Sequence, residues 1–300
     1  MFSITKHYKI WFTFSGLLMV GSVVLLVMWG LKPGIDFQGG VLTEAAFEKS
    51  VNPQEIRQAL VDARFEEVIV QPVSDQSVLI KTKPLDTDRV EEFKKTLKEK
   101  IGPYQEVQFE SIGPVIGREL VRKAYWQIAL VTLGIVLYIT YAFRKIGKQT
   151  KKAKVSPWHL GVAAIIALIH DLLVTVGVFV VLGKFRGVEI DALFITALLT
   201  VLGFSIHDTI VVFDRIQEYL RVYPYKSLQA IIDYSVNSTM ARSINTSSTV
   251  IFVLISMLLF GGETIFNFVL ALLVGITVGT YSSVFIASPI VYLWHRNRET

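Results

Sequence analysis

The sequence predicts an α-helical polytopic membrane protein with six transmembrane helices and one α+β, ferredoxin-like domain between the first and second of them. Hydrophobic residues make up 52% of the 300 residues and charged residues only 18%. Soluble domains contain about 45–50% apolar and about 25% charged residues. Charged residues are also missing from several long stretches, and one polar stretch of about 90 residues separates the first of these from the rest. Together, the composition and this spacing predict the class.

The apolar stretches are long enough to cross a membrane, since a transmembrane helix needs about 20 predominantly apolar residues. The first stretch could instead be a cleaved signal peptide, because Lys6, His7 and Lys9 precede it. It is longer than the usual apolar core of roughly 7–15 residues and no A-x-A site follows, so we expect a retained anchor. The predicted spans are roughly 10–31, 124–143, 158–182, 190–213, 244–260 and 265–294.

The orientation follows from the loop RKIGKQTKKAK (144–154), which carries six Lys or Arg and no acidic residue. The positive-inside rule places such a loop in the cytoplasm. With six spans, both termini are then cytoplasmic and the long polar stretch lies outside. The net charge of +5 therefore needs no nucleic-acid partner, because its excess lies mostly beside the cytoplasmic face.

Several classes of function lack their motifs in this sequence. The chain has no cysteine, which excludes disulfides and cysteine-ligated zinc, and its five histidines occur singly, so we expect no metal. Neither G-x-x-x-x-G-K-[ST] nor G-x-S-x-G occurs. We therefore expect a protein that is not an enzyme.

The polar stretch, residues 32–122, reads as β-α-β-β-α-β, the ferredoxin-like arrangement. Asn52 followed by Pro53 predicts the start of its first helix, and Val107 and Phe109 alternate with polar residues along its last strand. Nothing in it suggests catalysis, so we expect a binding or lever domain. The predicted strands are 40–47, 67–73, 77–83 and 105–111, and the predicted helices are 52–63 and 86–101.

Two glycine-rich segments, 32–40 and 111–117, join this domain to the membrane spans. They are either close-packed junctions or a pair of hinges that let the domain swing, because glycine permits both. The predicted organisation is thus an N-terminal anchor (1–31), an extracytoplasmic domain (32–122) and five further spans with cytoplasmic loops and tail (123–300).

Motifs spread along the chain resemble those of the SecD/SecF family, the auxiliary subunits of the bacterial Sec preprotein translocase. GIDFQGG (34–40) is similar to the family signature that follows its first span. One six-span half is present, which resembles a stand-alone SecF and not a SecD–SecF fusion. The further motifs, which match the SecF side in order, are SIGPVIG (111–117), ALIHD (167–171), FSIHDTIVVFDRI (204–216), RSINTSST (242–249), FGG (260–262) and GTYSS (279–283).

The resemblance implies a multi-pass protein of the bacterial inner membrane, in the resistance-nodulation-division superfamily. It implies a partner, SecD, often with YajC, beside the SecYEG channel, and contact with the secreted preprotein is possible. The energy source would be the proton gradient, with no cofactor. The residues that carry the signature and the hinge hypothesis are Gly34, Asp36, Gly39, Gly40, Gly113 and Gly117.

One acid lies deep in the fourth span. Asp208 is about six residues past the middle of that span, or roughly 9 Å from the bilayer centre at about 1.5 Å per residue. Buried charges in membranes usually face the bundle interior and have a partner, and Arg242 at the start of the next span is a candidate. The resemblance implies that Asp208 and Arg242 are proton-pathway residues.

Each of these polar residues also has a structural interpretation. Asp208 could be held by neighbouring hydroxyls, and Arg242 could be an ordinary positive-inside residue. Asn245 and Thr246 could relay protons or bond neighbouring helices. The third span carries a further pair, His170 and Asp171, which is either a second relay station or a brace between helices.

The last span carries a line of small residues, Gly275, Gly279 and Ser283, which predicts close packing of another helix. Because such transporters are built from two related halves, we expect a partner half. The leading hypothesis is a proton-coupled subunit in protein export. The alternatives are half of a small-molecule efflux transporter and a scaffold that stabilises the translocon without acting as a motor.

Overall fold

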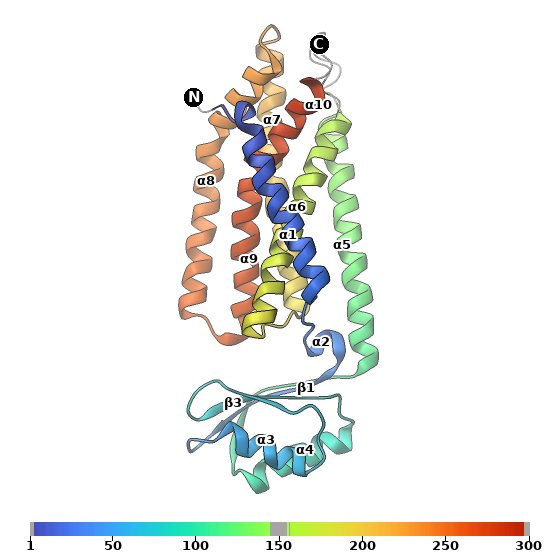
Figure 1. Ribbon diagram of the computed structural model, residues 1–300, viewed down its shortest axis with the longest axis vertical. Coiled ribbons are helices and arrows are strands. Elements are labelled where there is room, and N and C mark those ends of the chain that lie inside the picture. The colour runs from blue at the N-terminus through green and yellow to red at the C-terminus, as the bar shows by residue number, and fades with distance from the viewer. Residues whose placement is uncertain (1–2, 145–154, 156, 297–300) are drawn as a thin grey trace. The chain divides into compact units, whose positions relative to one another are not determined.

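The computed structural model describes residues 3–144, 155 and 157–296 (Figure 1). The chain divides into two units, Pro33–Tyr125 and a helical bundle made from the residues on either side of it. Six helices are long and apolar enough to cross a membrane, and a small sheet lies between the first two in the sequence. The predicted fold class is confirmed.

The bundle begins with a 3-10 turn, Thr5–His7, followed by α1. The last span is made of α9, a π-helical segment Ser283–Ala287 and α10 in succession. The helices are α1 (Tyr8–Trp29), α5 (Pro114–Ala142), α6 (Pro157–Arg186), α7 (Ala192–Val222), α8 (Leu228–Phe260), α9 (Glu263–Ser282) and α10 (Ser288–Arg296).

Three of these helices extend well beyond the predicted spans. The start of α8 is Leu228 and not 244, the end of α7 is Val222 and not 213, and the start of α5 is Pro114 and not 124. A run of uncharged residues marks only the apolar part of a helix, whereas the polar turns continue until a cap ends them. Ser227 caps α8 by accepting a hydrogen bond from the Ala230 amide (3.3 Å).

The interior of the bundle is formed by α6, α7 and the last span (Figure 1). In the most apolar stretch of each span, 50% of the residues are buried in α6, 50% in α7 and 56% in the last span. The corresponding share is 6% in α1 and 6% in α5. Gly275 and Gly279 of α9 lie against α7, where an added Cβ would overlap Val201 and lie 2.9 Å from Ser205 Cβ. The predicted line of small residues therefore meets α7. Its third member, Ser283, is buried at the start of the π-helical segment.

A distant aspartate holds the start of the chain. Asp233 of α8 accepts hydrogen bonds from the Thr5 amide (2.9 Å), Thr5 Oγ1 (2.9 Å) and Ser3 Oγ (2.6 Å). The carboxylate thus satisfies N–H and O–H donors at the N-terminal end of the first span, where a negative charge is favoured. This contact was not predicted from the sequence.

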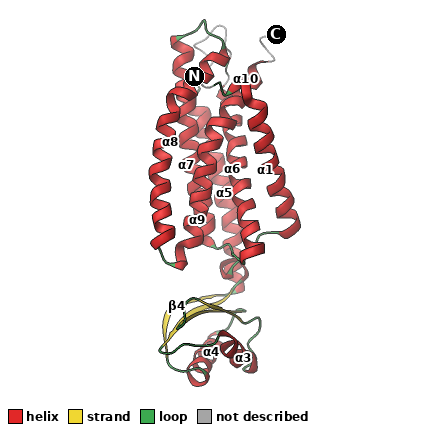
Figure 2. Ribbon diagram, turned by 60° about the vertical axis from the view of Figure 1, so that its left-hand side comes forward, coloured by secondary structure: helices red, strands yellow, loops and turns green. Residues whose placement is uncertain are grey.

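The unit Pro33–Tyr125, called the ferredoxin-like domain below, contains four strands in the antiparallel order β2-β3-β1-β4. Figure 2 shows α3 and α4 on one side of the sheet. The Asn52 side chain accepts from the Gln54 amide (2.9 Å), as the predicted cap requires. The elements are β1 (Gly40–Phe47), α3 (Pro53–Asp62), β2 (Ile69–Pro72), β3 (Ser77–Thr82), α4 (Thr87–Lys100) and β4 (Tyr104–Ile112).

The simple alternation predicted for the last strand is wrong at Val107. The pairing of β1 with β4 shifts between Glu44 and Ala45, so that Val107 has no opposite residue, and its side chain is 56% exposed. A bulge of this kind bends an edge strand and moves a side chain away from its expected face. An alternation of residue types does not reveal it.

The glycine-rich junction is closely packed within this unit. A short helix, α2 (Ile35–Gln38), lies between Gly34 and Gly39 and was not predicted. An added Cβ at Gly40 would lie 2.7 Å from Thr82 O, and one at Gly117 would lie 2.9 Å from Phe37 O. These two glycines are therefore required by close approach of the backbone.

The other residues of the glycine signature differ from Gly40 and Gly117 in how closely the surrounding atoms approach them. Gly39 has φ of 81° and would bring a Cβ within 3.1 Å of Ile112 O, whereas Gly113 has open space around it. Gly34 accepts from the Phe37 and Gln38 amides (both 3.1 Å), and Asp36 lies in the first turn of α2. The motion of a hinge here stays a prediction.

Candidate functional site: two aspartates inside the bundle

Asp208 lies inside the helical bundle on the buried face of α7. Ser205, Asp208, Thr209 and Val212 are buried at helical spacing, and the Asp208 side chain is only 2% exposed. Its Oδ2 is buried and has no hydrogen-bond partner in the part of the chain that the structure describes. A buried charged oxygen without a donor is costly, so this carboxyl is not held in one charge state by fixed partners.

Two serines of α8 lie beside this carboxyl. The hydroxyls of Ser243 and Ser247 are near enough to serve as hydrogen-bond donors to it after a small adjustment. Ser243 Oγ lies outside hydrogen-bond geometry, and within the described residues it too has no partner. Ser247 Oγ is engaged elsewhere, 2.6 Å from Thr280 Oγ1 of α9. A charged Asp208 could accept from the Ser243 hydroxyl after a small rotation, and a protonated Asp208 could donate to it.

Asp171 of α6 has the opposite environment. Its carboxylate is fully buried and accepts hydrogen bonds from Ser205 Oγ (2.5 Å) and Ser282 Oγ (2.8 Å) at Oδ2. His170 Nδ1 donates to Oδ1 (3.0 Å). Three helices, α6, α7 and α9, therefore meet at one acid. Among the described residues, the buried Nε2 of His170 has no partner.

The glycines of α9 explain how these helices come close enough. Gly279 lies directly against Ser205, so that α7 and α9 approach each other beside Asp171. A larger side chain at this position would separate the two serines that bind one carboxylate oxygen.

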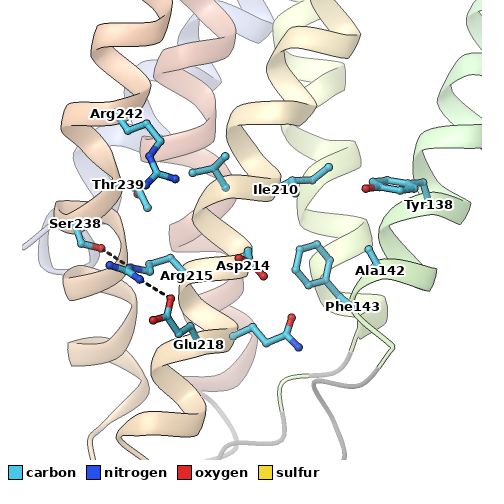
Figure 3. Close-up of a pocket in the computed structure, with 12 residues that line it drawn as sticks. Tyr138, Ala142, Phe143, Ile210, Asp214, Arg215, Glu218, Ser238, Thr239 and Arg242 are labelled. Carbon is cyan, nitrogen blue, oxygen red and sulfur yellow. Dashed lines mark hydrogen bonds and ion pairs between the residues drawn. The ribbon is translucent and has the colours of Figure 1, made fainter.

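The remaining predicted residues of α8 lie elsewhere. Arg242, Asn245 and Thr246 are exposed. No ion pair joins Arg242 to Asp208 among the residues that are described, so the predicted partner is not in contact. Instead, Arg242 lines a cavity of about 330 Å³ between α5, α7 and α8 (Figure 3), which Asp208 does not line. Whether any of these residues carries protons stays a prediction.

Comparison with known proteins places this site in a family. Residues 92–297 match the family described as protein export membrane protein SecD/SecF, C-terminal, and residues 24–51 match the SecD/SecF GG motif. The chain belongs to the SecD/SecF family. The GG match contains Gly39 and Gly40, and the larger match contains both buried aspartates.

The relatives lie on the SecF side of the SecD/SecF family. A protein translocase subunit SecF from Thermobaculum terrenum is 44% identical, with 98% of this chain and 94% of the relative covered. A SecF of Haemophilus influenzae is 38% identical, with 96% and 84% covered. The crystal structure of SecDF, a translocon-associated membrane protein from Thermus thermophilus, aligns with a TM-score of 0.81 and 32% identity. It covers 98% of this chain, which spans only 39% of the SecDF chain.

Within this SecD/SecF chain, sequence reasoning found both aspartates but missed the serines around them. Ser205 precedes Asp208 by three residues and so shares its helix face, a signal that was available. Ser282 was missed because its contact depends on how α9 packs. The basic loop used for orientation lies outside the described residues from 145 to 154. In the described part of the chain, no group of three or more His, Asp or Glu residues could hold a metal ion.

Proposed function

We propose that this chain works as a proton-coupled subunit of the Sec preprotein translocase, together with a SecD partner, in late steps of protein export. In this proposal both termini are cytoplasmic and the ferredoxin-like domain lies outside. SecYEG, YajC and the preprotein are the further expected partners. The chain itself catalyses no reaction, and the proton gradient supplies the energy without a cofactor.

The observation that carries the proposal is the environment of Asp208. Its Oδ2 is buried without a partner and the neighbouring Ser243 hydroxyl is unpartnered too, within the residues that are described. A carboxyl with this environment can exchange a proton without first breaking strong hydrogen bonds. One charge that crosses 100 mV gains about 2.3 kcal/mol, which changes the ratio of two states by roughly fiftyfold.

Arg242 takes a second role in the proposed cycle. It precedes Ser243 in α8, but its side chain is exposed and extends toward α7 in the cavity (Figure 3). A rotation or shift of α8 that brings the guanidinium to Asp208 would stabilise the charged carboxylate. Protonation of Asp208 would release it. Asn245 and Thr246 would line the path of that movement.

His170 and Asp171 have a different role in this proposal. The three hydrogen bonds that Asp171 accepts favour a brace between α6, α7 and α9 over a second relay station. The brace gives α8 a fixed support against which to move.

The length of this chain relative to SecDF supports the proposal of a separate SecD partner. The chain spans 39% of the SecDF chain and aligns over 98% of its own length. The rest of a SecDF chain has to include the SecD portion. In the proposal, a separate SecD subunit supplies it.

The test is the substitution Asp208→Asn, with Asp88→Asn in the exposed first turn of α4 as the matched control. Both proteins are reconstituted with SecD and SecYEG in vesicles, and export of a secretory precursor is measured with and without a proton gradient. We expect Asp208→Asn to assemble normally and to lose the proton-dependent part of export, while Asp88→Asn keeps it.

The alternatives make other predictions. A scaffold tolerates Asp208→Asn whenever the complex forms, so normal proton-dependent export by this variant would falsify the motor. An efflux transporter needs a ligand cleft in the outer domain. Binding of a small-molecule efflux substrate to the purified chain, without any effect on export, would favour that alternative.

A further inference from the structure

The cavity between α5, α7 and α8 contains two charged side chains that form no ion pair among the described residues. Arg242 and Asp214 both line it, and neither makes an ion pair or a hydrogen bond within the part of the chain that is described. The other two charged residues of the cavity are paired, since Arg215 binds Glu218 and also donates to Ser238 Oγ (3.3 Å) (Figure 3). The cavity therefore presents one cation and one anion.

These two charges lie at different depths. At about 1.5 Å per residue, Asp214 is about 12 Å from the end of α7 at Val222, whereas Arg242 is about 21 Å from the start of α8 at Leu228. A short connection, 223–227, joins these two helix ends at one side of the bundle. Arg242 is therefore the deeper charge, and Asp214 is nearer the water.

The wall opposite these charges is apolar and aromatic. Tyr138 extends from α5 toward α7, and Phe143 packs edge-on against Phe213 at the end of α5 (Figure 3). Along α5, Leu133 is 55% exposed and Leu137 is 61% exposed. These leucines belong to the same helix as Tyr138, which lines the cavity, and offer an apolar surface on which an acyl chain could lie.

The charge pattern matches a zwitterionic lipid headgroup. In the leaflet that contains this cavity, the phosphate of a phospholipid lies deeper than the ammonium group attached to it. A guanidinium is suited to bind phosphate oxygens through paired N–H donors. A carboxylate accepts hydrogen bonds from a primary ammonium, which a quaternary ammonium does not donate.

We propose that this cavity binds a phospholipid with a primary ammonium headgroup, such as phosphatidylethanolamine, with the phosphate at Arg242 and the ammonium at Asp214. The volume of about 330 Å³ accommodates a headgroup and leaves the acyl chains outside, along α5. The inference goes beyond the proposed function and does not depend on it. It concerns a lipid site in the arrangement shown here, in which Arg242 lies in the cavity and not at Asp208.

The test uses the purified full-length chain in detergent and native mass spectrometry. Phosphatidylethanolamine, phosphatidylcholine and phosphatidylglycerol with identical acyl chains are added in equal amounts. We expect phosphatidylethanolamine to be retained about tenfold better than either other lipid, the difference for one charge-assisted contact. Asp214→Asn should abolish this preference and leave the weaker binding of phosphatidylcholine unchanged.

Arg242→Gln should weaken retention of all three lipids, and Arg242→Lys should restore part of it. Arg221→Gln, an exposed position of α7 outside the cavity, is the matched control and should bind like the unchanged chain. The inference is overturned if the unchanged chain does not prefer phosphatidylethanolamine, or if Asp214→Asn keeps the preference. Loss of the lipid when the partner subunit is bound would also overturn it, because a protein surface would then fill the cavity.

Discussion

Asp171 and Asp208 are buried acids of neighbouring helices, but their surroundings differ in almost every respect. Asp171 accepts hydrogen bonds from His170, Ser205 and Ser282, which come from three helices. The buried Oδ2 of Asp208 accepts no hydrogen bond among the described residues, and the neighbouring Ser243 hydroxyl makes none either. Burial alone therefore does not distinguish a structural acid from one that can exchange a proton. In the proposed function, the two kinds of acid differ in the number of hydrogen bonds that the carboxylate accepts from fixed donors.

The two environments have different consequences for the fold. Breaking the hydrogen bonds of Asp171 would leave the Ser205 hydroxyl and His170 Nδ1 without their acceptor and Ser282 with Gly279 O alone, so Asp171 should matter for stability. Removing the charge of Asp208 breaks no fixed hydrogen bond at Oδ2, so Asp208 should matter for function and little for stability. This difference can be measured.

The largest effect is expected for Asp171→Ala. Removing a buried acceptor leaves its buried donors unsatisfied, at about 1–3 kcal/mol for a donor, and Asp171 accepts from three. Here His170 would stay buried without its acceptor. We expect the free energy of unfolding in detergent to fall by at least about 3 kcal/mol, as measured by denaturant titration. Asp171→Asn keeps one acceptor oxygen and should lose less. Wild-type stability of Asp171→Ala would contradict the brace.

A smaller effect is expected for Gly279→Ala. The added Cβ would lie 2.9 Å from Ser205 Cβ, so α7 and α9 must separate beside Asp171. Overpacking of this kind costs about 1–3 kcal/mol. Gly134→Ala in α5 is the matched control, since an added Cβ there meets nothing within 4 Å. It should stabilise the helix slightly, by up to about 1 kcal/mol. Equal stability of the two variants would show that Gly279 does not set the helix spacing.

Local patterns made much of the fold predictable. The apolar stretches predicted all six spans, and caps such as Asn52 predicted elements of the ferredoxin-like domain. Helix ends were predicted poorly where a polar helix continues beyond its apolar part, as in α8 from Leu228. The bulge at Val107 was missed because it depends on pairing between strands and not on residue types in one strand.

The site was predictable in its residues but not in its contacts. The cost of a charge in the membrane singles out Asp171 and Asp208 from the sequence alone. Whether an acid finds hydrogen-bond donors depends on residues of other helices, here Ser205 of α7 and Ser282 and Gly279 of α9. A single sequence does not give the rotation of these helices relative to one another. For the same reason Arg242 was a plausible partner of Asp208, while the structure directs it into the cavity of α5, α7 and α8.

The smallest effect is expected from a matched pair of serines, one beside each aspartate. Ser282→Ala removes a hydrogen bond of 2.8 Å to Asp171 and should lower the free energy of unfolding by about 1 kcal/mol. Ser243→Ala removes a buried hydroxyl that has no partner among the described residues, and its unfolding free energy should stay unchanged or rise, by up to about 1 kcal/mol. Both are measured by denaturant titration in the same detergent. Equal losses would mean that Ser243 does bind Asp208 when the protein is folded, and the contrast between the two acids would disappear. If the proposed function is right, a stable Ser243→Ala should slow proton-dependent export more than Ser282→Ala does, because Ser243 lies beside Asp208.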